Sequence, residues 1–503
     1  MVLAKFQPKA LDVNQWKLVL IVAGIGTILE YFDFYCYTQL SAVLGKVFFP
    51  SGDPVVTALS YWGVFAIAFV SRPVGALFYG HIGDKYGRRW SFTFAILQQA
   101  FGTFLIGILP TYAIGRYSAG IASPILLAII RIIQGTAFGG EFGGAAVYIS
   151  ELADVKTRAR SVTALQCMVN IGLALASLLS LALQASLSKE AMLEWGWRVP
   201  FLVAGFTAFI GYYIRRGLPE PAAFVNAKKE EQLADEAEGV EGGATVKADA
   251  GLVVGTPTTG KATPESDDEE SDVDAQDQGV LTAFHGHSRA KLPFVRLLKN
   301  NATGLAIHFL FGAWVFGAFF VAVTWLATEL ANGFGLPGPI ALTITIISLF
   351  FNAAGLLTAG YLLDHGLPAI RAWAATVVVG VSTGFGLYWW VGTGSIAALW
   401  VAPSLLHLVI GFGQAFVVLP LTRIYHPLER TTGFSFAFAV GYGILGGISP
   451  IVVTALKAKL PAEIKGIAPA IWLSILSAGS FIGVILLRLY LPRLDKPYVG
   501  RIR

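Results

Sequence analysis

Residues 80–89 read GHIGDKYGRR, and residues 360–371 read GYLLDHGLPAIR. Both stretches begin Gly-x-x-x-Asp, carry a further glycine two or three positions after that Asp, and follow a long apolar run. Glycines, an Asp and cations in this order are typical of a tight turn whose charges dock against neighbouring helix ends. The recurrence of the pattern predicts that the second half of the chain repeats the first.

The composition predicts a helical membrane protein. Of the 503 residues, 55% are apolar and only 13% are charged, and the mean hydropathy is +0.65. Soluble proteins carry about 25% charged residues. Apolar runs of about 20 residues match the length that a helix needs to cross the bilayer. We expect twelve such spans, near 17–40, 55–79, 90–110, 120–148, 160–186, 199–214, 302–329, 338–362, 371–391, 396–420, 432–456 and 468–491.

The distribution of Lys and Arg predicts the topology. An even number of spans places both termini on one side of the membrane. That side holds roughly 27 of the 36 Lys and Arg residues, because the termini and the loops after spans 2, 4, 6, 8 and 10 are basic. We therefore expect both termini in the cytoplasm, in a plasma membrane or a bacterial inner membrane. The net charge of +5 follows from this bias, so no nucleic-acid partner is expected.

The chain is predicted to have three parts. Residues 1–225 and 296–503 each hold six spans, and residues 226–295 form an acidic segment with few large apolar side chains. Such a segment cannot bury enough surface to offset its conformational entropy, so it is predicted to be disordered and cytoplasmic. Two related six-helix bundles of matching orientation predict a cavity between them at mid-membrane.

Several pattern matches fail on context. GTPTTGKA (255–262) nearly matches a nucleotide-binding loop, but Ala262 stands where a magnesium ligand is needed and no strand precedes it. GYGILG (441–446) lies in a predicted membrane helix, where glycines permit close helix packing. No cluster has metal-ligand spacing, and no nucleophile–base set is visible. The sequence therefore predicts no enzyme, no metal and no cofactor apart from a coupling proton.

Residues 80–89 resemble the cytoplasmic loop between spans 2 and 3 of the major facilitator superfamily. GTILEYFDFYCY (26–37), RIIQGTAFGGEFGGAAVYISE (131–151) and ERTTGFSFAFAVGYGILGGISP (429–450) narrow the resemblance to its metabolite:proton symporter family. The resemblance implies an all-α fold of two pseudo-symmetric six-helix bundles. It also implies import, with protons, of organic acids such as 2-oxoglutarate, citrate and shikimate, or of proline and betaine.

Buried charges single out a candidate site. Glu30 and Asp33 lie three residues apart on one face of span 1, and Arg131 lies about 11 residues into span 4. Charges in hydrocarbon are costly and mark function. The proton affinity of an acid near Arg131 would change as a cavity opens around it. We expect Asp33 and Glu30 to exchange the proton and Arg131 to bind a carboxylate, with Arg72 as a second candidate. A static ion pair between spans 1 and 4 is the alternative.

The remaining candidates concern gating and cavity shape. The resemblance implies a cytoplasmic latch in which Glu141 pairs with Arg88 or Arg89, and the gating set is Gly80, Asp84, Gly87, Arg88, Arg89 and Glu141. Possible cavity residues are Tyr37, Asn170, His308, Asn352 and His407. Five aromatic residues are further candidates for substrate shape: Trp314, Phe316, Phe320, Trp325 and Tyr442.

These features predict a monomeric proton-coupled symporter that imports a small organic acid by alternating access, in contact with substrate and lipid bilayer. Three alternatives stay open. The chain could be a nutrient receptor that signals through residues 226–295, where Ser266 and Ser271 precede acids and are candidate targets of a kinase. It could also be an uncoupled facilitator, or a proline/betaine-type osmolyte symporter.

Overall fold

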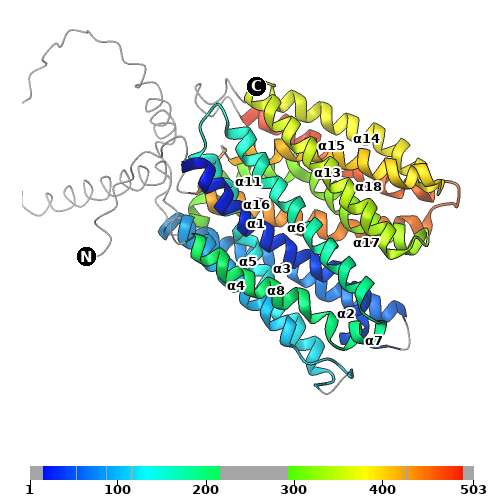
Figure 1. The fold of residues 1–503 in the computed structure, drawn as a ribbon. Helices are drawn as coiled ribbons and strands as arrows, with labels where there is room; N and C mark the ends of the chain where they lie inside the picture. The colour runs from blue at the N-terminus through cyan, green and yellow to red at the C-terminus, as the bar shows by residue number, and fades with distance from the viewer. Residues whose placement is uncertain are drawn as a thin grey trace, which may run out of the picture.

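The structure is a computed structural model that describes residues 15–51, 54–86, 88–114, 117–215, 293–422, 424–425 and 429–490. Within these ranges the chain is almost entirely helical (Figure 1). Most of the predicted acidic segment, with Ser266 and Ser271, lies outside the described residues. Its last residues, 293–295, form the start of a helix.

Six long helices make up the first half of the chain. Short helices follow the first and fifth of them at the same end of the molecule, close to each other in Figure 1. The long helices are α1 (Gln15–Gln39), α3 (Pro54–Tyr86), α4 (Arg88–Ile108), α5 (Ala122–Leu152), α6 (Arg158–Ser186) and α8 (Arg198–Arg215); the short ones are α2 (Ser41–Phe48), α7 (Lys189–Ala191) and the π-helix η1 (Met192–Gly196).

The second half also has six long helical segments, and two of these contain π-helical turns. The first is α11 (Pro293–Phe320) with η2 (Val321–Trp325), α12 (Leu326–Thr328) and η3 (Glu329–Gly333). The others are α13 (Gly338–Asp364), α14 (Ala369–Gly392), α15 (Ile396–Thr422), α16 (Arg430–Val440) continued by η4 (Gly441–Gly446) and α17 (Gly447–Lys459), and α18 (Ala468–Tyr490), which follows the 3₁₀ turn η5 (Lys465–Ile467).

Each long segment coincides with one of the twelve predicted spans. Among the described residues, nine are long and apolar enough to cross a membrane by length and composition. The three segments that do not meet this standard are α1, α4 and α8, so a count of twelve membrane spans stays a prediction for them. The division at residues 225 and 295 likewise stays a prediction.

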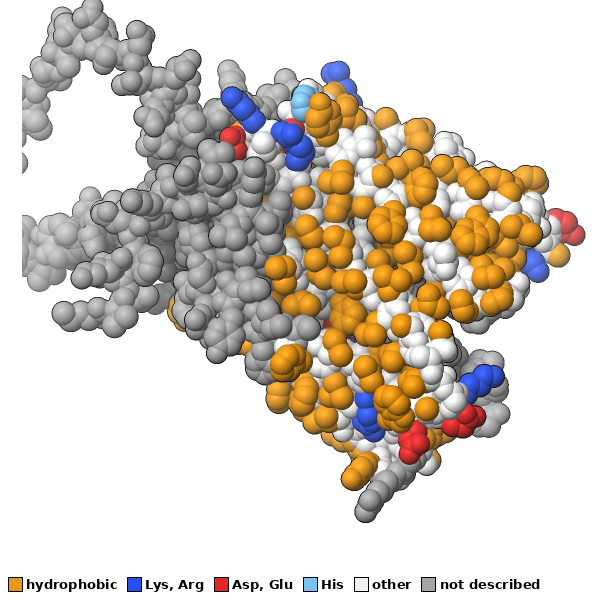
Figure 2. Space-filling model, viewed as in Figure 1, with side chains coloured by type: hydrophobic (Ala, Val, Ile, Leu, Met, Phe, Trp, Pro, Cys, Tyr) orange, Lys and Arg blue, Asp and Glu red, His pale blue; other side chains and the backbone are white. Residues whose placement is uncertain are grey.

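Apolar side chains cover the sides of the helices. Figure 2 shows a broad hydrophobic band over the visible face, with charged side chains gathered near the two ends. Large apolar residues stand well exposed on the helices, among them Val70 at 74%, Phe206 at 70% and Phe350 at 69%. Such a surface suits lipid, since every backbone group of a helix is satisfied within the helix itself.

Two glycines bring α3 and α5 into backbone contact. A Cβ atom added at Gly135 would lie 2.1 Å from the carbonyl oxygen of Ala68, and one at Gly139 would lie 2.0 Å from the carbonyl oxygen of Arg72. The pair forms a Gly-x-x-x-Gly pattern, which allows close helix packing in membranes. The turn of α3 that carries Arg72 is therefore held directly against α5, the helix of Arg131.

The two halves meet along α3, α5 and α6 on one side and α11, α13 and α16 on the other. At Gly80 an added Cβ would lie 2.7 Å from the Cα atom of Thr432, and at Gly360 it would lie 2.2 Å from Oγ1 of Thr163. Both contacts lie at the end that the sequence predicts to be cytoplasmic. Toward the opposite end, where α2, α7 and α17 lie, the halves diverge in Figure 1.

Candidate functional site

Asp33, on α1, is the centre of a buried polar network. Its side chain is 2% exposed. The Oδ2 atom accepts hydrogen bonds from Nε2 of Gln99 on α4 and, at 3.3 Å, from Nε2 of Gln134 on α5. The Oδ1 atom is buried and makes no hydrogen bond to any residue that the structure describes. One oxygen of this carboxyl is thus held by two amides, while the other has an open hydrogen-bonding position.

Gln134 connects Asp33 to Arg131. Its Nε2 also donates to Oγ1 of Thr103 at 2.8 Å, and its Oε1 accepts from Nη1 of Arg131 at 3.1 Å. The guanidinium carbon of Arg131 lies 4.0 Å from the ring centre of Tyr37. The structure therefore brings Asp33 and Arg131 into one network, as the sequence predicts. These two side chains are joined through the Gln134 amide and make no direct ion pair with each other.

Arg72, on α3, sits among aromatic rings. Its guanidinium carbon lies 3.9 Å from the ring centre of Phe138, 4.0 Å from that of Phe69 and 5.2 Å from that of Phe34. The faces of these rings stabilise the buried cation. Glu30, also buried, lies within electrostatic reach of Arg72. Arg72 is also within electrostatic reach of Arg131, so the buried charges of α1, α3 and α5 lie in one region.

Two small cavities lie between the halves beside these residues. The first, here the Arg72 cavity, has a volume of about 10 Å³ and includes Arg72, Phe320 and Thr324 in its lining. The second, here the Asn170 cavity, has a volume of about 20 Å³ and includes Asn170 and Gln414. Their shared walls are Tyr31, Phe319 and Tyr442. Each has room for about one water molecule, so the centre of the described molecule is occluded.

Asn170 and Asn352 meet at the boundary of the halves. Nδ2 of Asn170 donates to Oδ1 of Asn352 at 2.8 Å, and Nδ2 of Asn352 donates to the carbonyl oxygen of His407 at 3.2 Å. The two predicted cavity histidines lie elsewhere. His407 Nδ1 is 2.8 Å from the carbonyl oxygen of Pro403, and His308 Nδ1 is 3.1 Å from the Tyr425 hydroxyl. Neither histidine lines a central cavity.

Of the five predicted aromatic residues, some line a central cavity and the others do not. Phe320 and Tyr442 line the Arg72 cavity. Phe316 lies behind Tyr442, with ring centres 4.7 Å apart, and Trp314 packs on Trp373 inside the second half. Trp325 lines neither central cavity. The glycines of η4 do allow close packing, as the sequence predicts: a Cβ at Gly441 would lie 2.1 Å from the ring of Phe316, and one at Gly446 would lie 2.5 Å from that of Phe320.

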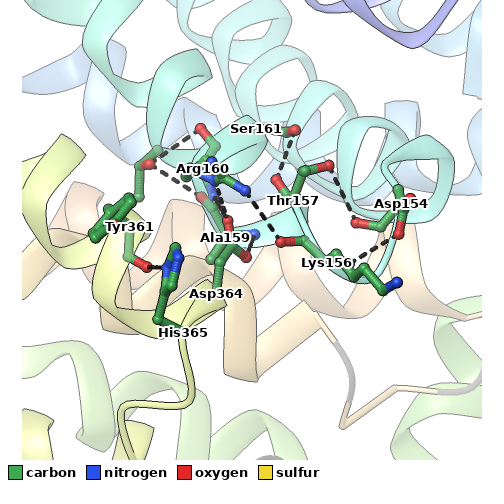
Figure 3. Close-up of polar contacts among 10 residues, drawn as sticks. Asp154, Lys156, Thr157, Ala159, Arg160, Ser161, Tyr361, Asp364 and His365 are labelled. Carbon is green, nitrogen blue, oxygen red and sulfur yellow. Dashed lines mark hydrogen bonds and ion pairs between the residues drawn. The ribbon is translucent and has the colours of Figure 1, made fainter. Parts of the chain in front are cut away.

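Asp364 closes the predicted cytoplasmic end (Figure 3). As the last residue of α13, it accepts hydrogen bonds from the backbone nitrogens of Ala159 at 2.9 Å and Arg160 at 3.0 Å, and from Nε of Arg160 at 2.8 Å. A carboxylate at the first backbone N–H groups of a helix acts as an N-cap and complements the helix dipole. The second half of the chain therefore caps α6 of the first half.

A second ion pair joins the halves nearby. Nη1 of Arg430, the first residue of α16, lies 2.9 Å from Oε1 of Glu151 at the end of α5, and both side chains are buried. Gly80, from the predicted gating set, packs against α16. The side chains of Asp84, Arg88, Arg89 and Glu141, and residue Gly87 as a whole, lie outside what the structure describes. The latch between Glu141 and Arg88 or Arg89 stays a prediction.

Comparison with known proteins identifies the fold family. Residues 23–450 match the Major Facilitator Superfamily. The chain belongs to this superfamily. An inner membrane metabolite transport protein of Escherichia coli K12 is 40% identical over 218 residues, which cover 43% of this chain and 49% of that relative. A proline/betaine transporter of Salmonella typhimurium is 36% identical over 214 residues, which cover 42% of each. The chain thus spans less than half the length of these curated relatives.

Solved structures of superfamily members show the same fold. A proton:xylose symporter bound to 6-bromo-6-deoxy-D-glucose has a TM-score of 0.72, with 17% identity, over 96% of this chain and 97% of that chain. The human organic anion transporter has a TM-score of 0.60, with 14% identity, over 96% and 100%. The superfamily fold, its multi-pass membrane character and the prediction that the chain is not an enzyme are confirmed.

Several residues that the structure places in or near the candidate site were not predicted from the sequence. Gln134 lies three residues after Arg131, on the same helix face, and this spacing was the available signal. Asp364 was visible as the acid of the repeated turn pattern. For Gln99 no local signal distinguishes it from neighbouring polar residues. Among the described residues, no group of three or more His, Cys, Asp and Glu side chains could hold a metal ion.

Proposed function

We propose that this chain is a proton-coupled symporter that moves a small, carboxylate-bearing metabolite across a membrane by alternating access. The observation that carries the proposal is the arrangement around Asp33. A buried carboxyl with two amide donors on one oxygen, and no donor from the described residues on the other, is suited to carry a proton. A proton on Oδ1 leaves the hydrogen bonds to Oδ2 in place.

Arg131 is the positive charge that pairs with Asp33 in the proposal. The amide group of Gln134 lies between the two side chains and hydrogen-bonds to both. Attraction between opposite charges grows as water leaves a site, and so does the cost of burying an ionised group. Wetting and drying of the network therefore change the proton affinity of Asp33. This couples proton exchange to the opening and closing of the cavity beside it.

Arg72 is the proposed partner of the substrate carboxylate. Among the described residues it is the cation that lines the Arg72 cavity, the Asn170 cavity has no lining cation, and the Nε of Arg72 makes no hydrogen bond to a described residue. Arg131 lines neither cavity. A single lining cation matches a substrate with one carboxylate better than a di- or tricarboxylate, since each further charge would enter the site uncompensated. A monocarboxylate is our first candidate.

A zwitterion of the proline/betaine type is the second candidate. Tyr31, Phe319 and Tyr442 wall both central cavities, and Phe142 and Phe438 wall the Asn170 cavity. Aromatic faces attract ammonium and quaternary ammonium groups. Arg72 at one end and aromatic walls at the other would bind the two charges of such a molecule. The similarity to proline/betaine transporters over part of the chain supports this candidate.

The contacts between halves support the transport cycle. Asp364 with α6, and Glu151 with Arg430, hold one end closed. We place this end in the cytoplasm because of the Lys and Arg distribution. The two bundles, residues 1–225 and 296–503, would rock about the central aromatic contacts as a monomer. Opening at this end requires both ion pairs to separate.

Uptake by the full chain in proteoliposomes tests the proposal. With an inward proton gradient, we expect accumulation of a monocarboxylate or of glycine betaine, and loss of accumulation on addition of a protonophore. Arg72→Lys keeps the charge but not the fork of donors, so we expect KM to rise while the proton dependence stays. Uptake indifferent to the protonophore would identify an uncoupled facilitator. Deleting residues 228–288 separates transporter from receptor: a transporter keeps uptake.

A further inference from the structure

A larger pocket lies at the end opposite Asp364, away from the central cavities. This outer pocket has a volume of about 430 Å³ and lies among η2 and η3, the end of α14, the end of α17 and η5. The volume falls in the range of small-molecule sites, about 300–1,000 Å³. All of its lining comes from the second half of the chain, so it is not the cavity between the bundles.

The packing around the pocket brings its walls close together. Gly392 and Gly466 lie in contact, since a Cβ added to Gly392 would lie 3.2 Å from the Cα atom of Gly466. On the floor, the Tyr388 side chain is 1% exposed, and its hydroxyl makes no hydrogen bond to any described residue. A buried hydroxyl without a partner is costly. Since water does not reach this hydroxyl, a ligand in the pocket would meet other atoms of Tyr388.

The charges of the lining are balanced. Glu329 and Lys457 form an ion pair whose side chains are 14% and 27% exposed, and Lys457 lies 6.0 Å from the ring centre of Trp325. The other two charged residues of the lining are Glu463 and Lys465. Two acids and two bases sum to zero. A ligand with net charge would leave one charge of the pocket or ligand uncompensated, whereas a neutral ligand that carries both signs would not.

We propose that the outer pocket binds a small zwitterion, a molecule with one carboxylate and one ammonium or quaternary ammonium group. The carboxylate would bind Lys457, and the ammonium group would lie between Glu329 and the face of Trp325. This site is additional to the proposed central site and does not require that the bound zwitterion be the transported substrate.

The pocket is joined to the central site through η2. Trp325 is the last residue of η2 and lines the outer pocket, and the two residues before it, Val323 and Thr324, line the Arg72 cavity. The carbonyl oxygen of Val323 also accepts a hydrogen bond from the Tyr35 hydroxyl of α1, at 2.7 Å. Occupation of the outer pocket therefore acts on the segment that contacts the first half of the chain.

Equilibrium dialysis with radiolabelled glycine betaine tests the proposal. The full chain is placed in lipid nanodiscs in an Arg72→Ala background, which removes the cation of the central cavities. We expect binding to remain in that background. Lys457→Gln should weaken it roughly tenfold or more, because a charged hydrogen bond is lost. Lys459→Gln, which changes a lysine outside the pocket lining, should leave it unchanged.

A second variant guards against a folding defect in the first. Thr393→Trp fills the exposed rim of the pocket without removing a charge, and should abolish binding in the Arg72→Ala background. Neither choline nor acetate at tenfold excess should displace glycine betaine. Absence of binding in the Arg72→Ala background, or binding that Lys457→Gln and Thr393→Trp both leave unchanged, would overturn the proposal while leaving the proton-coupled uptake test unaffected.

The lipid of the nanodisc distinguishes a free zwitterion from a lipid headgroup. Discs of phosphatidylglycerol carry no zwitterionic headgroup, whereas discs of phosphatidylethanolamine do. Equal binding of glycine betaine in both supports a soluble ligand. Binding that is present in phosphatidylglycerol and lost in phosphatidylethanolamine would assign the pocket to a lipid and overturn the soluble occupant.

Discussion

Asn170 of the first half and Asn352 of the second half share a buried hydrogen bond of 2.8 Å. The two residues belong to α6 and α13, and Asn170 also lines one of the central cavities. In the proposed transport cycle, the bond lies on the surface along which the two halves would separate or rotate. The free energy of this bond is one contribution to the association of the two halves, and it can be measured.

A double-mutant cycle should detect this attraction. Asn170→Ala and Asn352→Ala each remove one partner, and we expect a coupling free energy of about 0.6 kcal/mol, a typical value for hydrogen bonds between membrane helices. Unfolding of both single variants and the double variant gives the value. Since Asn352→Ala also loses the bond to the His407 carbonyl, the cycle is needed to isolate the pair. A coupling of zero would show that the contact adds nothing to the closure of the halves.

Asp33→Asn should uncouple transport from protons. The amide keeps the shape of the side chain but cannot carry the proton, so we expect accumulation driven by a proton gradient to disappear. Exchange of substrate across the membrane should remain, and counterflow in proteoliposomes measures it. Glu190→Gln, at an exposed acid in α7, is the matched control. Proton-driven accumulation by Asp33→Asn at the normal level would disprove the coupling assignment.

Gln134→Leu should break the link between Asp33 and Arg131. The change leaves a buried carboxylate and a buried guanidinium each without one partner, which costs roughly 1–3 kcal/mol per group. Loss of a donor to Oδ2 favours the protonated carboxyl, so the pH of half-maximal uptake should rise. Gln98→Leu on α4 removes a glutamine outside the network, whose Nε2 bonds to Ile133 and Thr136. The pH profile of that control should not move.

Asp364→Asn should loosen the closed end. The amide loses the charge that pairs with Arg160 and complements the first turn of α6. Arg160 is 44% exposed, so water screens part of the ion pair, and we expect a loss of about 1 kcal/mol, mainly because the amide has one acceptor oxygen where the carboxylate uses two. In a chain with Cys36 and Cys167 replaced by Ala, maleimide labelling of Thr163→Cys reports the opening.

We expect Asp364→Asn to increase the labelling rate, because Thr163 is buried against Gly360 in the closed state. Asp154→Asn is the matched control. Asp154 accepts a bond from the backbone of Lys156 within its own loop and does not join the halves. Equal labelling rates in the two variants would show that Asp364 does not hold this end closed.

Gly139→Val should destabilise the first half. The new side chain would collide with the carbonyl oxygen of Arg72, and overpacking of this kind costs typically 1–3 kcal/mol. A thermal melt of the purified chain in detergent measures the effect. Gly384 has no atom within 4 Å of an added Cβ, so Gly384→Val should melt close to the unchanged chain. A melt of Gly139→Val at the same temperature would contradict the close packing of α3 and α5.

The sequence was informative about what lies along each helix and less so about which way it faces. The apolar runs predicted the long helices to within a few residues, apart from the extensions of α3 to Tyr86 and of α11 to Pro293. The acids of α1 and the cations of α3 and α5 were identified because charge is rare in such helices. The pairing of Asp33 with Gln99 depends on the packing of α1 against α4, which no local pattern encodes.

The aromatic residues show why facing is hard to predict. The π-helical turns η2 and η4 lie in the helices that carry Trp325 and Tyr442. A π-helical turn adds a residue to the helical repeat, so residues beyond it are rotated relative to a regular helix. Tyr442 faces the central cavities, and Trp325 turns to the outer pocket. A regular spacing of 3.6 residues per turn does not include the added residue, so it predicts the wrong facing for side chains in these segments.

The backbone contact between α3 and α5 bears on how the proposed transporter would couple the movement of the proton to that of the substrate. Arg72, the proposed substrate ligand, and Arg131, at the proton network, are carried by helices locked together at Gly135 and Gly139. Asp33, Gln99 and Gln134 also belong to the first half of the chain. In the proposed transport cycle, Arg72 and Asp33 would therefore move together as one rigid body. The second half would expose both to water, or exclude water from both, at the same time, and this shared timing would couple the movement of the two solutes.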